Sequence, residues 1–198
     1  MSNIEILTSK ETTAMLRKAL KAIYPGVKFS VRSDSSSMSS SVRISWEDGP
    51  TIKEVEEVAN GYEGSGCDGM IDMRYNRDSW LAPDGRAYFA GTKGTTGSMG
   101  VVPPSEEPAP VKGCRRVRFC LDSVFCSRKY SRTAIDTVLS TLKEKGAPKG
   151  IYTVRGSDDW GYSIDTNASA HADWLYWRQE AYKVMQAYHH VEDDKKAA

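Results

Sequence analysis

Apolar residues at helical spacing predict two helices in the first third of the chain. Thr8 and Glu11 have the spacing of a capping box, and the apolar stripe behind them ends at the Tyr-Pro-Gly of residues 24–26. We therefore expect one helix between these signals and a second over residues 50–62, which two glycines end. Each helix has one apolar side, so each is expected to pack one face against a core.

The clearest helical pattern lies in the second half of the chain. Residues 131–145 carry apolar side chains every three or four positions, and basic residues followed by a glycine close the pattern, as the helix dipole favours. A fourth helix is predicted over residues 170–188, with a wide apolar side that includes Trp174 and Trp177. This width suggests packing against more than one element.

Alternation of apolar and polar residues predicts paired strands between the helices. Residues 27–46 and residues 151–164 are each expected to form a hairpin, and residues 117–126 a third one. The first two hairpins each lie between two predicted helices, so both halves share the order helix, strand, strand, helix. An internal duplication would explain this shared order, and so would chance.

These patterns predict an α+β fold in which small antiparallel sheets of hairpins are covered by about four helices. Residues 1–82 would form one half, and residues 114–198 would add a hairpin to the second half. Residues 83–113, rich in Gly, Thr and Pro, are expected to form a flexible loop, because few apolar side chains are available to offset the entropy lost on ordering. Both halves together are expected to form one globular unit.

Composition supports a globular protein. The 198 residues are 39% hydrophobic and carry 27 Lys and Arg against 26 Asp and Glu. This balance argues against a disordered chain, a uniformly basic nucleic-acid binder and an acidic mimic of DNA. The sequence has neither a run of about eighteen apolar residues nor the layout of a signal peptide, which predicts a soluble cytoplasmic protein without a membrane partner.

The cysteines and histidines lack the spacing of a metal site. Cys114, Cys120 and Cys126 are separated by five residues each, whereas zinc ligands usually come in pairs about two to four residues apart. The remaining candidate ligands lie elsewhere in the chain: Cys67, His171, His189 and His190. We expect reduced thiols, no bound metal and no cofactor.

Catalytic motifs are equally scarce. The glycine-rich residues 91–100 lack the flanking strand and helix of a phosphate loop, and Gly64-Ser65-Gly66 lacks the outer glycines of a nucleophile elbow. Three acids could hold a metal or act as an acid–base pair, although acids beside glycines are more often structural. If the chain is an enzyme, these acids are the catalytic candidates: Asp68, Asp72 and Asp78.

Charge is unevenly distributed along the chain. Residues 47–72 hold eight acids and one lysine, whereas residues 112–132 hold seven basic residues and one acid. We expect the basic residues to bind nucleic-acid phosphates or an acidic protein surface. They are Lys112, Arg115, Arg116, Arg118, Arg128, Lys129 and Arg132. The alternative is that the two stretches lie side by side and neutralise each other, so the binding hypothesis requires basic side chains that point away from the chain's own acids.

Several phrases of the sequence resemble a known family. They are YPGVKFSVRS at residues 24–33, VRISWEDGPT at 42–51, CDGMIDM at 67–73 and VFCSRKYS at 124–131. The resemblance is to the twenty-ninth of the large polyvalent-protein-associated domains, whose members occur on phages, plasmids and conjugative elements, alone or within very long multidomain proteins. It implies a role in establishing foreign DNA in a bacterial cell, or in interference with host defences, and implies no particular reaction.

Three functional hypotheses follow. In the first, the chain is a non-enzymatic binding protein of a mobile element that inhibits or modulates a host defence complex, or a nucleic acid within one, through its basic surface. In the second, it is a nuclease or nucleotide-modifying enzyme that uses the three acids. In the third, it is a structural module that forms a homodimer or larger oligomer through the helix bearing Trp174 and Trp177.

Overall fold

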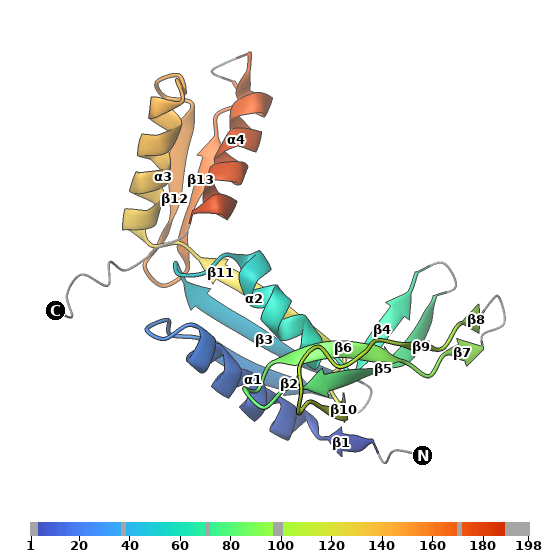
Figure 1. Cartoon of the computed structure of the whole chain (residues 1–198). Coiled ribbons are helices and arrows are strands. Elements are labelled where there is room, and N and C mark those ends of the chain that lie inside the picture. Colours follow the sequence, from blue (N-terminus) through green and yellow to red (C-terminus); the bar gives the residue numbers. More distant parts are fainter. Residues whose placement is uncertain (1–3, 37–38, 70–71, 97–100, 170–171, 189–198) are drawn as a thin grey trace. The chain divides into compact units, whose positions relative to one another are not determined.

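The chain separates into two compact units in the computed structural model shown in Figure 1. The structure describes residues 4–36, 39–69, 72–96, 101–169 and 172–188. The first unit consists of residues 1–45 and 53–127, and the second consists of residues 46–52 and 128–198.

The first unit contains most of the strands. Its helical elements are α1 (Ser9–Ile23), α2 (Ile52–Ala59) and the 3-10 turn η1 (Asn60–Tyr62). Its strands are β1 (Glu5–Leu7), β2 (Ser30–Ser35), β3 (Ser40–Glu47), β4 (Ser65–Asp68), β5 (Met73–Leu81), β6 (Ala87–Thr92), β7 (Thr95–Thr96), β8 (Val101–Val102), β9 (Ser105–Glu106), β10 (Arg115–Phe119) and β11 (Ser123–Lys129). The last two residues of β3 and of β11 belong to the second unit.

The predicted capping box at the start of α1 is confirmed. The Glu11 amide donates to the Thr8 hydroxyl, and the Thr8 amide donates to Glu11 Oε2 at 2.9 Å. These hydrogen bonds satisfy amides that a helix start would otherwise leave unpaired. Just beyond α1, the Tyr24 hydroxyl donates to the Glu54 carbonyl of α2 at 3.0 Å, which ties the two helices together.

The main sheet of this unit has six strands in the order β1-β10-β5-β6-β9, and β4 pairs with the remaining part of β5. β1 runs parallel to β10, with Glu5 opposite Val117. A second sheet, in the order β11-β3-β2, is also mixed. The expectation of purely antiparallel sheets is therefore wrong. β1 lies far from β10 along the chain, so no tight turn forces the two strands into opposite directions.

Two of the three expected hairpins are present. β2 and β3 pair antiparallel with Val31 opposite Ile44, and the hairpin of the second unit is described below. The hairpin expected over residues 117–126 is wrong, because β10 and β11 belong to different sheets. Between them, the Asp122 amide donates to the Ser40 carbonyl at 2.9 Å and Asp122 Oδ2 accepts from the Ser40 amide at 2.8 Å, so the chain changes sheets here.

Residues 83–113, expected to form a loop, contain strands β6 to β9. β6 pairs with β5 along its length, and the side chains of Ala87, Ala90 and Thr92 are buried. Backbone pairing with β5 satisfies polar groups, and small side chains allow close packing, so a segment poor in large apolar residues still joins the sheet. Residues 97–100 lie outside the described residues.

The core of the first unit forms where η1 crosses the main sheet. Tyr62 is fully buried, its ring lies 5.0 Å from the Phe119 ring, and its hydroxyl donates to the Gly85 carbonyl. The Gly64 amide donates to the Leu121 carbonyl at 2.8 Å. A β-carbon on Gly64 would lie 1.6 Å from the Phe119 carbonyl oxygen, so this crossing requires glycine.

The second unit contains the other confirmed hairpin. Its elements are α3 (Arg132–Glu144), β12 (Tyr152–Ser157), β13 (Gly161–Thr166) and α4 (Trp174–Ala187). The side chains of Tyr152, Val154 and Ile164 point from the hairpin toward buried residues of the helices. Thus α3 and α4 cover one face of the β12–β13 hairpin (Figure 1).

The order helix, strand, strand, helix occurs twice, as α1-β2-β3-α2 and as α3-β12-β13-α4. That part of the prediction is confirmed, and the duplication itself stays a hypothesis. Within the described residues, no helix has both the length and the apolar character that spanning a membrane requires.

We predict that Gly64→Ala lowers the free energy of unfolding by about 3 kcal/mol or more, because the new methyl group would overlap backbone that packing prevents from moving. Urea denaturation of the purified protein measures the change. Gly69→Ala is the control, since a β-carbon at Gly69 would meet no atom within 4 Å. Equal stability of Gly64→Ala and the wild type would contradict the described crossing.

Candidate functional site

Two arginines of β10 are held by the chain's own carboxylates. Arg118 Nε donates to Asp78 Oδ1 at 2.8 Å, and Arg116 Nη2 lies 3.1 Å from Asp78 Oδ2. Arg116 Nη1 also lies 2.6 Å from Glu106 Oε1, and its guanidinium lies 5.9 Å from the centre of the Trp80 ring. Both arginine side chains are less than one-fifth exposed. They are therefore structural ion-pair partners of a buried carboxylate.

The remaining basic candidates of the first unit are more exposed. Arg115 forms an ion pair with Glu5 of β1, and both side chains are about half exposed. Lys112 is exposed, and no ion pair joins it to a carboxylate of the described residues. Of the basic residues predicted for binding in this unit, Lys112 alone therefore extends into solvent without a partner among the residues that the structure describes.

Arg128, in the second unit, is buried. Its Nη2 donates to the carbonyls of Gly49 at 2.9 Å and Tyr188 at 2.6 Å, and its Nε donates to the Asp48 carbonyl at 3.1 Å. The Tyr130 ring lies 4.8 Å from the guanidinium. These contacts join three separate segments of the second unit, so Arg128 is engaged within the fold, and its part in a binding surface stays a prediction.

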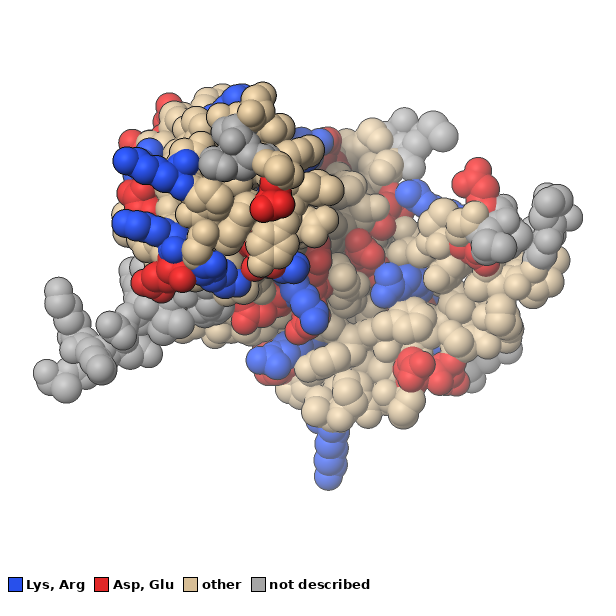
Figure 2. All heavy atoms as spheres, turned by 90° about the horizontal axis from the view of Figure 1, so that it is seen from above, with Lys and Arg blue, Asp and Glu red and all other residues tan. Residues whose placement is uncertain are grey.

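The last two basic candidates also contact nearby acidic residues of the second unit. Lys129 Nζ donates to the Asp159 carbonyl at 2.6 Å, and Arg132 Nε lies 3.2 Å from Asp136 Oδ1. Figure 2 shows acidic and basic side chains next to one another over the visible face. The seven predicted residues are thus divided between two units, and four of them form ion pairs with the chain's own acids: Arg115, Arg116, Arg118 and Arg132.

The three candidate catalytic acids are not gathered into one site. Asp78 is fully buried between its two arginines, where no substrate has access. Asp68 lies opposite Met73 at the far end of the β4–β5 pair, and Asp72 is exposed in the turn between those strands. Because Asp78 follows Met73 by five strand residues, it lies roughly 17 Å along the sheet from this turn.

The structure assembles no metal site from the residues that it describes. No group of three or more His, Cys, Asp or Glu side chains has a suitable arrangement there. His171, His189 and His190 lie outside the described residues. All four cysteines are free thiols, and Cys67 and Cys120 are exposed.

The oligomerisation hypothesis named two tryptophans of α4. Trp177 is buried in the second unit, so its side chain is not available for a contact with another chain. The large exposed apolar side chains of α4 are Leu175, Tyr176 and Tyr182, on the helix face opposite the core.

The first unit has a groove that is open to solvent. It has a volume of about 630 Å³ and lies between the end of α2 and strand β6. Its walls are Glu57, Asn60, Gly61, Arg77, Ala87, Tyr88, Phe89, Glu107, Pro108 and Pro110. A smaller adjoining pocket shares Glu57, Ala87 and Tyr88 with it and adds Tyr24, Glu54 and Arg86, among others.

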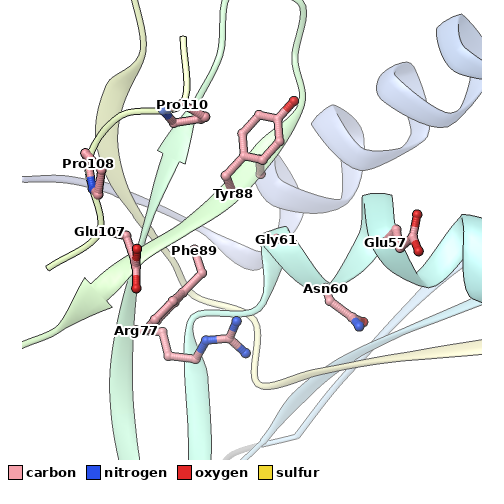
Figure 3. A pocket seen from close by; sticks show the side chains of 10 residues that line it. Glu57, Asn60, Gly61, Arg77, Tyr88, Phe89, Glu107, Pro108 and Pro110 are labelled. Atoms are coloured by element: carbon pink, nitrogen blue, oxygen red, sulfur yellow. The ribbon is translucent and has the colours of Figure 1, made fainter. Parts of the chain in front are cut away.

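Figure 3 shows how the groove is built. Phe89 lies at its centre, with Glu107 on one side and the Asn60 and Glu57 side chains on the other. The Arg77 guanidinium lies 4.8 Å from the centre of the Phe89 ring, and its Nη1 lies 3.2 Å from Glu63 Oε2. Because Glu63 neutralises Arg77, the charge facing the groove is set by Glu57 and Glu107.

Burial and the acids of α2 raise the pKa values of two neighbouring side chains, Tyr24 and Cys126. Burial raises the pKa of the Tyr24 phenol, and the charges of Glu54 and Glu57 raise that pKa further. On the other side of the helix, burial raises the pKa of the Cys126 thiol to about 12, with smaller contributions from Glu56 and Glu63. α2 is therefore an acidic helix with an accessible flank along the groove.

The groove residues share no pattern that can be recognised along the chain. The acidic stretch of residues 47–72 is the one sequence feature that marks α2 as a candidate charged surface. No sequence spacing joins Glu57 to Tyr88, Phe89 and Glu107, because β6 approaches the end of α2 only in the folded chain. A β-carbon on Gly61 would lie 1.9 Å from the Ala87 carbonyl oxygen, which shows how closely they meet.

The fold and these surfaces define an α+β protein with an acidic, aromatic groove and with no assembled catalytic cluster among the described residues. The model of one family, large polyvalent protein associated domain 29, matches residues 7–131. The chain belongs to this family, which is associated with the polyvalent proteins of mobile elements. No curated protein and no solved structure matches the chain.

We predict that Asp78→Asn lowers the free energy of unfolding by about 3 kcal/mol, because the part-buried Arg118 would lose its carboxylate partner and Arg116 would keep only Glu106. Asp72→Asn, in an exposed turn, is expected to change it by less than about 0.5 kcal/mol. Chemical denaturation measures both changes. If the two variants are equally stable, Asp78 does not have the structural role described here.

The cysteines are expected to differ in their rates of alkylation. At pH 8, iodoacetamide is expected to modify Cys67 and Cys120, which are exposed, much faster than Cys126. The raised pKa of Cys126, about 12, leaves almost no thiolate at that pH, and its burial limits access. Peptide mass spectrometry gives the three rates, and rapid modification of Cys126 in the folded protein would contradict the packing of β11 beside α2.

Proposed function

We propose that the chain is a non-enzymatic binding protein of a mobile genetic element, and that its groove holds a basic segment of a host defence protein. The groove between α2 and β6 carries this proposal. It presents two carboxylates and two aromatic rings on a surface that stays open to a macromolecule.

The charge of the groove favours a basic partner. Glu57 and Glu107 are exposed, and neither forms an ion pair with another described residue. Carboxylates on both sides would attract Lys or Arg side chains, with the pairing strengthened when water is excluded. Lys or Arg side chains of the partner would thus neutralise two carboxylates that have no ion-pair partner among the described residues.

The apolar walls fit the same partner. The Tyr88 ring suits the aliphatic stems and cationic heads of Lys and Arg, whereas the Phe89 ring already contacts the chain's own Arg77 guanidinium and would add mainly apolar contact. Pro108 and Pro110 line another part of the groove and have no backbone N–H to donate. A peptide segment fits an open groove of this kind better than a small molecule, which requires more enclosure.

The family supplies the setting. Association with mobile elements is compatible with a protein that meets host defences, as the sequence analysis expects. The proposed contact differs from the basic surface of that analysis, because Arg116, Arg118 and Arg128 are engaged within the fold. The enzyme hypothesis receives no support from the geometry, since Asp78 is buried and is not beside Asp72.

We predict that the double variant Glu57→Gln, Glu107→Gln binds a basic peptide about tenfold more weakly than the wild type, which corresponds to about 1.4 kcal/mol. The probe is a fluorescein-labelled peptide of alternating Lys and Tyr, measured by fluorescence anisotropy. Glu47→Gln, Glu144→Gln is the control, because it removes the same charge from exposed positions outside the groove. Equal affinity of both double variants, or no binding by the wild type, would refute the groove assignment.

The counter-defence role has a separate test in cells. The chain is expressed in hosts that carry restriction or RNA-guided immunity, and phage plating is counted. The wild type and the control variant should restore plating, whereas the groove variant should not. If the wild type leaves plating unchanged in these hosts, the counter-defence role is wrong even where peptide binding holds.

A further inference from the structure

The three-stranded sheet of the first unit has one buried face and one open face. Val31, Val42 and Ile44 are buried on the inner face. The register of β2 and β3 places Arg32 directly opposite Arg43 on the other face, where both residues are exposed. Two guanidiniums thus share one cross-strand position on the open face.

This pair works against the stability of the sheet. Like charges directly opposite each other destabilise a strand pair by a few tenths of a kcal/mol, up to about 1. The nearest compensation is Asp34, whose Oδ2 lies 3.9 Å from Arg43 Nη2, with both side chains largely exposed. No described carboxylate lies within ion-pair distance of Arg32. Arg32 therefore has no ion-pair partner among the described residues, whereas the arginines of β10 are paired within the fold.

An aromatic ring lies on the neighbouring strand. β11 adjoins β3, and its Phe125 side chain is 56% exposed. The side chains of Val124 and Cys126, which precede and follow it, are half-buried and lie on the opposite face of the strand. The open face of β2 and β3 also carries two acids, Asp34 and Glu47, and its remaining residues on these strands are serines. Ser30 and Ser45 lie opposite each other, and Ser41 lies opposite Asp34. Small hydroxyl side chains keep this face flat between the arginines and the ring.

We propose that this open face, formed by β2, β3 and β11, binds single-stranded nucleic acid. Arg32 and Arg43 would contact successive phosphates, and the Phe125 ring would stack on a base. The serine hydroxyls between them can donate to the sugar-phosphate backbone. A duplex keeps its bases stacked on one another, so the ring has a partner only where the strand is single.

This inference extends beyond the proposed function, because it concerns other elements and the opposite sign of charge. The groove and the open face can be removed independently of each other. A chain that lacks one activity and keeps the other separates the two proposals.

The test uses a fluorescein-labelled oligothymidylate of about 12 nucleotides and its uridylate counterpart, measured by anisotropy at several salt concentrations. The wild type should bind one or both oligonucleotides, and a duplex of equal length more weakly. Preference for one of them identifies the strand as DNA or RNA. Failure of the wild type to bind either oligonucleotide at about 50 mM salt overturns the proposal.

Variants assign the binding to this face. Arg32→Ala, Arg43→Ala should reduce the slope of log affinity against log salt by about 1.4, because two phosphate contacts are lost. Phe125→Ala should weaken binding about tenfold and leave that slope unchanged. Lys10→Ala, Lys21→Ala on α1 is the charge-matched control. If this control and the arginine variant lose affinity equally, the open face is not the site.

Thermal denaturation tests whether the arginine variant loses binding because it misfolds. Removing two repelling guanidiniums should leave the unfolding midpoint unchanged or slightly higher, whereas loss of binding through misfolding would lower it. A large fall in the midpoint would show that the arginines are structural, and would overturn their assignment to nucleic acid.

Discussion

The ion-pair cluster around Asp78 is the constraint on which the surface chemistry of the first unit depends. A carboxylate with no solvent exposure is stable in its charged form only when cations compensate it, and Arg116 and Arg118 provide that compensation from the neighbouring strand. Meeting this requirement withdraws two arginines from any outside partner. The buried Asp78 therefore determines that Arg116 and Arg118 do not contribute free positive charge to the surface.

The same constraint explains why the acidic part of the sequence stays available. With the β10 arginines committed to Asp78, Glu5 and Glu106, the carboxylates along α2 keep few cations of their own. Glu57 and Glu107 consequently face an open groove without an ionic partner among the described residues. Net charge near zero conceals two kinds of surface, one neutralised within the fold and one exposed.

Local patterns predicted the helices and two hairpins, because capping residues, apolar spacing and alternation act within a few positions of the chain. They failed wherever segments far apart in sequence meet. Nothing near β1 signals that Glu5 will lie opposite Val117, and Asp122 reads as a turn residue although it marks a change of sheets. The ion pairs of the candidate residues were not predictable for the same reason: sequence shows how charges are grouped along the chain, whereas ion pairing depends on strand neighbours.

The short outer strands of the six-stranded sheet affect how copies of this protein meet. β1 has three residues and β9 has two, so each border of that sheet offers few backbone donors and acceptors to an incoming strand. Longer borders invite cross-chain pairing and the growth of insoluble aggregates. Borders of this length give another copy of the chain little to pair with along the six-stranded sheet.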